Sequence, residues 1–99
     1  MKASERERLP NRHNSIADVF NFEGHIYRAT ASYFGDGRLA EIFFDVGKAG
    51  AAIQVNAENS AILVSLLLQS GVDPETILHS VGGPVAIAIG RFMRLAVAS

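Results

Sequence analysis

The turn Gly47-Lys48-Ala49-Gly50 is the first place in this chain where residue types and spacing could do chemistry. It lies between a predicted strand and a predicted helix, where free backbone N–H groups, the helix dipole and a lysine can together hold a phosphate. A P-loop, however, requires the spacing Gly-x-x-x-x-Gly-Lys-Ser/Thr, and this turn has neither that spacing nor the hydroxyl. Two interpretations therefore stay open: a phosphate-binding turn that includes Lys48, and a plain connection that needs its two glycines.

The histidines and carboxylates are too scattered to predict a catalytic or a metal site. His13, His25 and His79 fall in three different segments, so no pair has the spacing of two ligands on one helix. Glu41 and Asp45 share a strand face, but they are about 13 Å apart at the standard rise of a strand, too far for a paired acid and base. We therefore expect no catalytic residue and no metal ion in this chain.

The composition predicts a small folded domain and excludes several functions. The chain has 99 residues, of which 48% are apolar and 19% charged, and its formal net charge is −1. This balance argues against bulk electrostatic binding to nucleic acid. There is no cysteine, which excludes a disulfide, a cysteine zinc site and a thiol nucleophile within the chain. With no apolar leader and no uninterrupted apolar run of membrane-spanning length, we expect a cytoplasmic protein without a membrane span.

Residues 1–15 are predicted to form an extended basic arm, and residues 16–99 a single domain. The arm is either a solvated tail or a segment that orders against a partner or an anionic ligand. Within the domain, three segments alternate apolar and polar residues with the period of a strand, and Asp36-Gly37 suits a hairpin turn. We expect them to form an antiparallel meander, with strands over residues 16–21, 25–34 and 39–46.

Helices are predicted after the strands, over residues 52–70, 74–81 and from residue 84 to 93 or beyond. Gly71 suits the C-terminal end of the first helix, and Asp73-Pro74 the start of the second. The run Ala61–Leu68 is apolar nearly all round, which predicts a helix buried on most sides. Strands followed by helices indicate an α+β fold, with two or three helices packed on one face of a three-stranded sheet.

The other face of the sheet is predicted to be open, with Phe43 exposed between Glu41 and Asp45. An exposed aromatic residue is either an ordinary surface feature or part of a contact surface on this open face. A domain this small buries only a modest core, so a partner would add to its stability.

Several blocks of the sequence, taken in order, resemble one known family. Arg8-Leu9-Pro10-Asn11-Arg12-His13 is similar to an Arg-x-Leu-Pro-x-Arg-Arg/His opening, and Gly35–Phe43 resembles the hairpin Gly-x-Asp-Gly-Arg-x-x-Glu-Ile-Phe. Gly47-Lys48-x-Gly50 followed by Ala61–Val72 is similar to a block that ends Ser-Leu-x-Leu-Gln-x-Gly-Val. Together they resemble the TSCPD family over about residues 8–92. This domain occurs at the C-terminal end of cobalamin-dependent ribonucleotide reductases and as small free-standing proteins.

The chain departs from the family at the motif that names it, Thr-Ser-Cys-Pro-Asp after the second helix. Residues 80–89 read Ser-Val-Gly-Gly-Pro-Val-Ala-Ile-Ala-Ile, so that Pro84 matches the proline of the motif and the cysteine is missing. Ribonucleotide reduction requires a cysteine radical and a reducing dithiol, and this chain supplies neither. The resemblance therefore implies a non-catalytic accessory or regulatory binding domain linked to deoxyribonucleotide metabolism. It implies no cofactor in this chain, although the family is associated with cobalamin enzymes.

Five residues are the candidate contacts for a partner or ligand. Arg8, Arg12 and Arg38 are predicted to contact an anion or a partner, Lys48 lies at the helix start, and Glu41 is the expected ion partner of Arg38. The expected partner is a protein, either a ribonucleotide reductase or a second copy of the chain, with a nucleotide or another phosphate as the alternative ligand. Two other functions stay open: a small subunit of a ribonucleoside-diphosphate reductase, and a structural homodimer.

Overall fold

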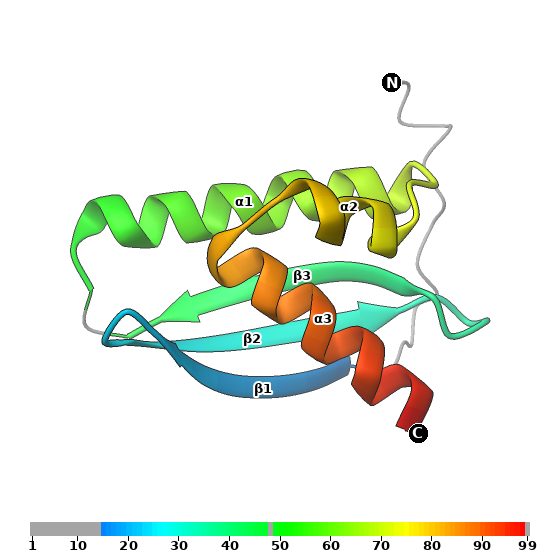
Figure 1. Ribbon diagram of the computed structural model, residues 1–99, viewed down its shortest axis with the longest axis horizontal. Helices are drawn as coiled ribbons and strands as arrows, with labels where there is room; N and C mark the ends of the chain where they lie inside the picture. The colour runs from blue at the N-terminus through cyan, green and yellow to red at the C-terminus, as the bar shows by residue number, and fades with distance from the viewer. Residues whose placement is uncertain (1–14, 48, 99) are drawn as a thin grey trace.

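Three antiparallel strands form the base of the fold (Figure 1). The structure is a computed structural model that describes residues 15–47 and 49–98. The strands β1 (Ser15–Phe22), β2 (His25–Tyr33) and β3 (Leu39–Val46) lie side by side in that order, each antiparallel to the next. The predicted meander is therefore confirmed, and every strand end lies within one residue of the expected position.

Two tight turns set the register of the sheet. Glu23 and Gly24, between β1 and β2, have φ angles of 50° and 83°. Two consecutive positive φ angles are typical of the turn whose twist matches that of a two-stranded hairpin. The Asn21 side chain reinforces it, since its Oδ1 accepts a hydrogen bond of 3.1 Å from the Gly24 N–H. Between β2 and β3, Gly37 has a φ of 95° and donates its N–H to the carbonyl oxygen of Phe34 at 2.9 Å.

Alternation along the strands sends every second side chain to the inner face of the sheet. Tyr27, Ala29, Ala31 and Tyr33 of β2 are all buried, as the sequence predicted. The inner face of β3 is buried as well, through Ala40, Ile42, Phe44 and Val46. Near the end of β2 the register shifts between Ser32 and Tyr33, where an irregularity interrupts the regular pairing with β3.

Three helices follow the strands and cover one face of the sheet (Figure 1). α1 (Ala51–Gln69) lies along β3, α3 (Gly83–Ala98) crosses the sheet diagonally, and the short α2 (Pro74–Ser80) packs against α3. The core between the two layers includes the fully buried side chains of Ile42, Ile89 and Phe92. This is the predicted α+β fold.

The sequence signals at the helix ends are confirmed, with one difference. Gly71 has a φ of 93° and ends α1, and the N–H groups of Gly71 and Val72 donate to the carbonyl oxygens of Leu68 and Leu67 at 3.1 and 3.0 Å. Asp73 takes the N-cap position of α2 ahead of Pro74, but its side chain makes no capping hydrogen bond. Asp73 therefore contributes the extended backbone of an N-cap residue but no hydrogen bond from its carboxylate.

The prediction that α1 is buried on most sides is wrong. Val55, Ile62, Leu63 and Leu67 point away from the sheet and are exposed, Leu63 to 61%. We call these four residues the outer face of α1. The physical reason is the two-layer architecture: a helix that lies on one sheet face covers only the side it turns toward the sheet, and α2 and α3 pack beside α1 rather than over it.

Apolar side chains are also exposed on the second face of the sheet. Val19, Ile26 and Phe43 lie there, and no helix of the described residues covers them. The exposure expected for Phe43 is therefore confirmed. Separately, α1 is long and apolar enough to cross a membrane by length and composition, a test that core helices of soluble proteins pass as well.

Candidate functional site

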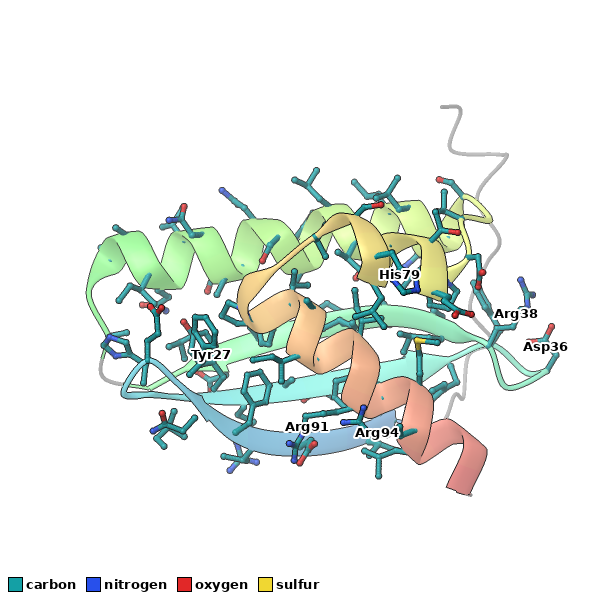
Figure 2. All side chains as sticks on the ribbon, viewed as in Figure 1. Tyr27, Asp36, Arg38, His79, Arg91 and Arg94 are labelled. Atoms are coloured by element: carbon teal, nitrogen blue, oxygen red, sulfur yellow. The ribbon has the colours of Figure 1, made fainter. Side chains whose placement is uncertain are left out.

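A pocket of about 310 Å³ opens where α1, the sheet and the start of α3 meet. β2 contributes Tyr27 to this pocket, and the N-terminal half of α1 and the first turn of α3 contribute the rest. Figure 2 shows the Tyr27 ring between the sheet and α1, beside the beginning of α3. The lining residues are Tyr27, Ile53, Asn56, Ala57, Ser60, Gly82, Pro84 and Val85. The sequence analysis did not identify this pocket as a site.

A cluster of aromatic rings fixes the position of Tyr27. Its ring stacks on Phe20 at 5.6 Å between centroids, and it meets the edges of Phe22 and Phe44 at 6.4 and 5.7 Å. Only 4% of the Tyr27 surface is exposed. Even so, its hydroxyl makes no hydrogen bond to any described residue, and no fully buried side-chain oxygen or nitrogen of the described residues lacks a partner. The Tyr27 hydroxyl must therefore reach the solvent inside the pocket.

The start of α3 presents backbone donors to the same pocket. The sequence Gly82-Gly83-Pro84 precedes the helix interior and supplies no capping side chain. The first N–H groups of a helix have no partner inside the helix. Those of Val85 and Ala86 therefore depend on solvent or a ligand. A Ser, Thr, Asp or Asn at the N-cap would have satisfied one of them. The pocket therefore combines a phenol hydroxyl with an uncapped helix N-terminus.

The remaining polar groups of the pocket are neutral. Ser60 donates its hydroxyl hydrogen to the carbonyl oxygen of Ala57 at 2.9 Å, which leaves its oxygen as an acceptor. Asn56 is exposed on α1 and carries both a donor and an acceptor. The other described residues of the walls are apolar, and none of the described lining residues is charged.

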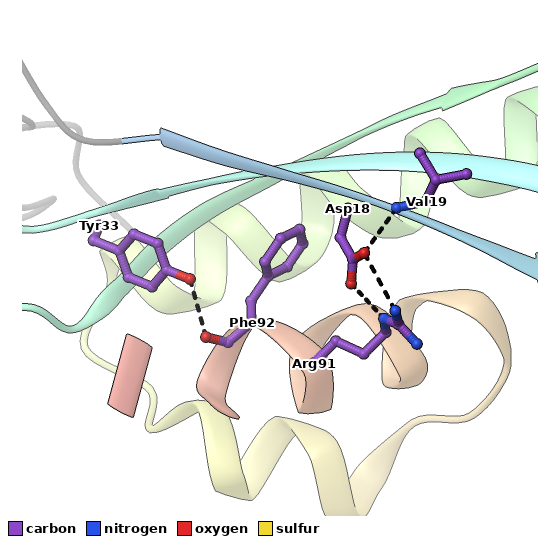
Figure 3. A network of polar contacts seen from close by, with 5 residues as sticks. All are labelled: Asp18, Val19, Tyr33, Arg91 and Phe92. Carbon is purple, nitrogen blue, oxygen red and sulfur yellow. Dashed lines mark hydrogen bonds and ion pairs between the residues drawn. The ribbon is translucent and has the colours of Figure 1, made fainter. Parts of the chain in front are cut away.

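At the other end of the sheet–helix layer, Tyr33, Ser65 and Gln69 each have a hydrogen-bond partner. The Tyr33 hydroxyl donates to the carbonyl oxygen of Phe92 at 2.9 Å (Figure 3), and burial raises the pKa of Tyr33 above its usual range. Ser65 of α1 accepts from the N–H of Ile42 at 2.9 Å and donates to its carbonyl oxygen at 3.1 Å. Gln69 donates to the carbonyl oxygen of Ala40 at 3.3 Å. These side chains of α1 satisfy the outer edge of β3.

An ion pair joins α3 to β1. Arg91 donates from Nε to Asp18 Oδ2 and from a terminal nitrogen to Oδ1 at 3.2 Å, while the N–H of Val19 donates to Oδ1 at 2.9 Å (Figure 3). The hydrogen bond from Arg91 is the main cause that lowers the pKa of Asp18. The guanidinium also lies 5.8 Å from the centroid of Phe20. The two residues are 73 positions apart, and no signal in the sequence pairs them.

Of the five predicted contact residues, only Arg38 and Glu41 lie in the part of the chain that the structure describes. Arg38 sits on the turn after β2 (Figure 2), where its Nε donates to Asp36 Oδ2 at 2.7 Å and its guanidinium lies 4.7 Å from the centroid of Phe34. The backbone N–H and the side chain of Arg38 lower the pKa of Asp36. Glu41 is half-buried on β3, opposite Ser32. The ion pair described for Arg38 is with Asp36.

The other predicted contacts, Arg8, Arg12 and Lys48, lie outside the described residues. Gly50 takes the N-cap position of α1 at the candidate phosphate turn and has no side chain to cap the helix. A second pocket, of about 340 Å³, borders this turn and is lined by Gly24, His25, Ile26, Val46, Gly47 and Ala49. Over the described ranges 15–47 and 49–98, no three His, Asp or Glu side chains come together as metal ligands would.

Comparison with known proteins places the chain in a family. The TSCPD domain matches residues 3–91. The chain belongs to the TSCPD domain family. Gly82, Pro84 and Val85, which line the pocket, lie within the matched residues.

The relatives are large enzymes of which this chain matches a small part. The vitamin B12-dependent ribonucleotide reductase of Agrobacterium fabrum is 45% identical over 71 residues, which is 72% of this chain and 6% of the relative. The corresponding enzymes of Bradyrhizobium diazoefficiens and Rhodopirellula baltica are 46% and 31% identical, over 69% and 75% of the chain and 5% and 7% of their own lengths. No solved structure matches the chain. The relationship to ribonucleotide reductases therefore rests on sequence.

Proposed function

We propose that this chain is a non-catalytic accessory domain of vitamin B12-dependent ribonucleotide reduction, and that it acts in the cytoplasm by binding a reductase polypeptide. One observation carries the proposal: a member of the TSCPD family, 45% identical to part of a reductase, contains no cysteine at all. Ribonucleotide reduction takes its radical and its electrons from thiols. A chain without thiols can assist that reaction by binding and cannot perform it alone.

The partner follows from the lengths of the relatives. In the reductase of Agrobacterium fabrum, the matching segment is 6% of a single polypeptide, so it is joined to the catalytic remainder. We infer that the surface of this domain evolved in contact with the rest of a reductase polypeptide. The outer face of α1 supports this inference, because four large apolar side chains exposed on one helix face are typical of a protein contact. Arg38 and Glu41, at the far end of β3, remain candidates for the rim of the same contact.

A complementation experiment tests this proposal. The chain is mixed with the Agrobacterium fabrum reductase in two forms, intact and lacking the segment that matches this chain. We expect sedimentation to show a complex with the shortened form and little with the intact form, whose own domain occupies the position. Cobalamin binding by the shortened form controls for its folding. The absence of a complex with a correctly folded shortened reductase would contradict the proposal, as would turnover of a ribonucleotide by the chain alone.

Two matched variants locate the contact. Leu63→Asp introduces a charge into the outer face of α1, and Val19→Asp does the same on the open face of the sheet, where the side chain is 47% exposed. We expect the first to abolish the complex and the second to leave it unchanged, since a desolvated charge without a partner is costly at an interface. Equal effects would place the contact elsewhere. Sedimentation of the chain alone over a concentration series separates this proposal from a structural homodimer.

A further inference from the structure

We propose that the pocket at Tyr27 is a binding site for a small carboxylate with an apolar body. The proposal is independent of the accessory function, because no residue that lines the pocket belongs to the outer face of α1. Failure of the reductase complex to form would leave the pocket and its chemistry unchanged.

The first support is the hydroxyl of Tyr27. The side chain is 96% buried, is held by three aromatic rings and lines the pocket, so the hydroxyl has a fixed position beside it. A tyrosine that is needed only for packing would be replaced by phenylalanine at no cost, and most buried tyrosine hydroxyls have a hydrogen-bond partner. Here the described residues provide no partner. The hydroxyl is therefore positioned to donate to something that enters the pocket.

The second support is the N-terminus of α3. This helix has 16 residues, long enough for its first turn to carry a partial positive charge of about half a unit. Its N–H groups at Val85 and the following residue are uncapped, and Pro84 fixes the first turn without adding a donor. Together with Tyr27, these donors suit an acceptor that carries negative charge.

The lining determines which anion fits. Among the described residues, no lysine, arginine or histidine lines the pocket, so none of them supplies the positive charge that favours a phosphate or a nucleotide. No aspartate or glutamate of the described ranges lines it either, so a single negative charge meets no repulsion from these residues. Ile53, Ala57 and Val85 provide apolar walls for the remainder of the ligand. A volume of about 310 Å³ holds roughly ten water molecules at ~30 Å³ each, which limits the ligand to a small molecule.

Benzoate is the probe we would use, with benzamide as its neutral counterpart and inorganic phosphate as the competing anion. Backbone amide shifts of the ¹⁵N-labelled chain report where each one binds. We expect saturable shifts from benzoate at Gly82, Val85 and the residues 53–60, with a Kd of roughly 1–10 mM for a ligand of this size. Benzamide should bind about tenfold more weakly, because it lacks the charge that the helix N-terminus favours. Phosphate should give no saturable shift at these amides.

The two tyrosines of β2 provide a matched pair of variants. Tyr27→Phe removes the free hydroxyl and should weaken benzoate binding about fivefold, the loss of one hydrogen bond. Tyr33→Phe removes the hydroxyl that is bonded to Phe92 and should change the Kd by less than about twofold. Ser60→Leu places an apolar side chain in the pocket and should abolish the shifts, while a dispersed spectrum confirms that this variant folds.

Three results would overturn the assignment. The first is the absence of a saturable shift from benzoate at the pocket amides. The second is equal binding of benzoate and benzamide, or tighter binding of phosphate, which would contradict the carboxylate. The third is a Kd that Tyr27→Phe leaves unchanged, which would show that the hydroxyl is not a contact.

Discussion

The two ends of the layer between the sheet and the helices each contain a buried tyrosine, and the two tyrosines differ in their hydrogen bonds. Tyr27 and Tyr33 lie on the same face of β2 and are nearly equally buried, with 4% and 7% of their surfaces exposed. The Tyr33 hydroxyl has a partner on α3, whereas the Tyr27 hydroxyl opens into a pocket. We call these the closed end and the open end. Burial alone does not distinguish a structural tyrosine from one that faces a site, and the hydrogen bonds do.

The serines of α1 repeat this difference. Ser65, at the closed end, bonds to both backbone groups of Ile42 on the edge strand β3. Ser60, at the open end, bonds only to the carbonyl oxygen of Ala57 in its own helix. The closed end therefore uses its polar side chains to hold the layers together and to cover a strand edge. The open end leaves its polar groups available.

The largest difference is expected from two isoleucine truncations. Ile89→Ala at the closed side of α3 should lower the free energy of unfolding by about 2–5 kcal/mol, because the side chain is fully buried and leaves a cavity. Ile53→Ala, in the wall of the pocket, should lower the free energy of unfolding by less than about 2 kcal/mol, because solvent already reaches this position. Chemical denaturation of both variants measures the two losses. Equal losses would show that the open end is packed as tightly as the closed end.

The next effect concerns the serines. Ser65→Ala leaves the N–H and the carbonyl oxygen of Ile42 buried without a partner, and should lower the free energy of unfolding by about 1–3 kcal/mol. Ser60→Ala should change it by less than about 0.5 kcal/mol, since its hydrogen bond lies within the helix at the surface. Hydrogen exchange at Ile42 should accelerate in the first variant only. Unchanged exchange there would indicate that another group covers the edge of β3.

The tyrosines should show a smaller effect on stability, in the opposite order from their effect on benzoate binding. Tyr33→Phe removes a buried hydrogen bond to the carbonyl oxygen of Phe92 and should lower the free energy of unfolding by about 0.5–1.5 kcal/mol, whereas Tyr27→Phe should be nearly neutral. Denaturation at neutral pH measures both.

Tyr33 also predicts a dependence on alkaline pH. Its pKa is raised in the folded state, so the folded protein retains the phenol proton more strongly than the unfolded chain. The contribution of the Tyr33 phenol to stability is therefore fully present below the usual pKa of about 10, and it is lost as the pH rises through the pKa of the folded state. Tyr33→Phe should remove this part of the alkaline loss. An identical alkaline profile in that variant would assign the loss to another group.

The smallest effect is expected at the ion pair between α3 and β1. Asp18→Asn should lower stability at pH 7 by less than about 1 kcal/mol, because the pair is partly exposed to solvent and salt. The pKa of Asp18 is lowered in the folded state, so its contribution is present above the usual carboxylate range and is lost as the pH falls through the folded pKa. The difference between the variant and the parent should disappear in acid and shrink in high salt. A difference that persists in acid would contradict an electrostatic origin.

Much of the fold could be predicted because it depends on local patterns. The period of two in β2, the turn at Gly37 and the left-handed Gly71 each report a constraint that acts within a few residues. The missing cysteine, which carries the proposed function, is likewise a property of composition. The candidate contacts were harder to predict: the ion pair of Arg38 with Asp36, two positions away, was not among the expected contacts.

The amino-acid sequence by itself determined the order of strands and helices, the inward and outward faces of the sheet and the absence of thiol chemistry, because each of these follows from neighbouring residues or from composition. Only the tertiary structure decided that Tyr33 is bonded while Tyr27 is not, that Asp18 meets Arg91, and that the outer face of α1 is left uncovered. These features depend on the angle at which α3 crosses the sheet and on the number of layers that cover the sheet. The local sequence of an apolar helix or of a buried tyrosine does not indicate whether another element packs against it.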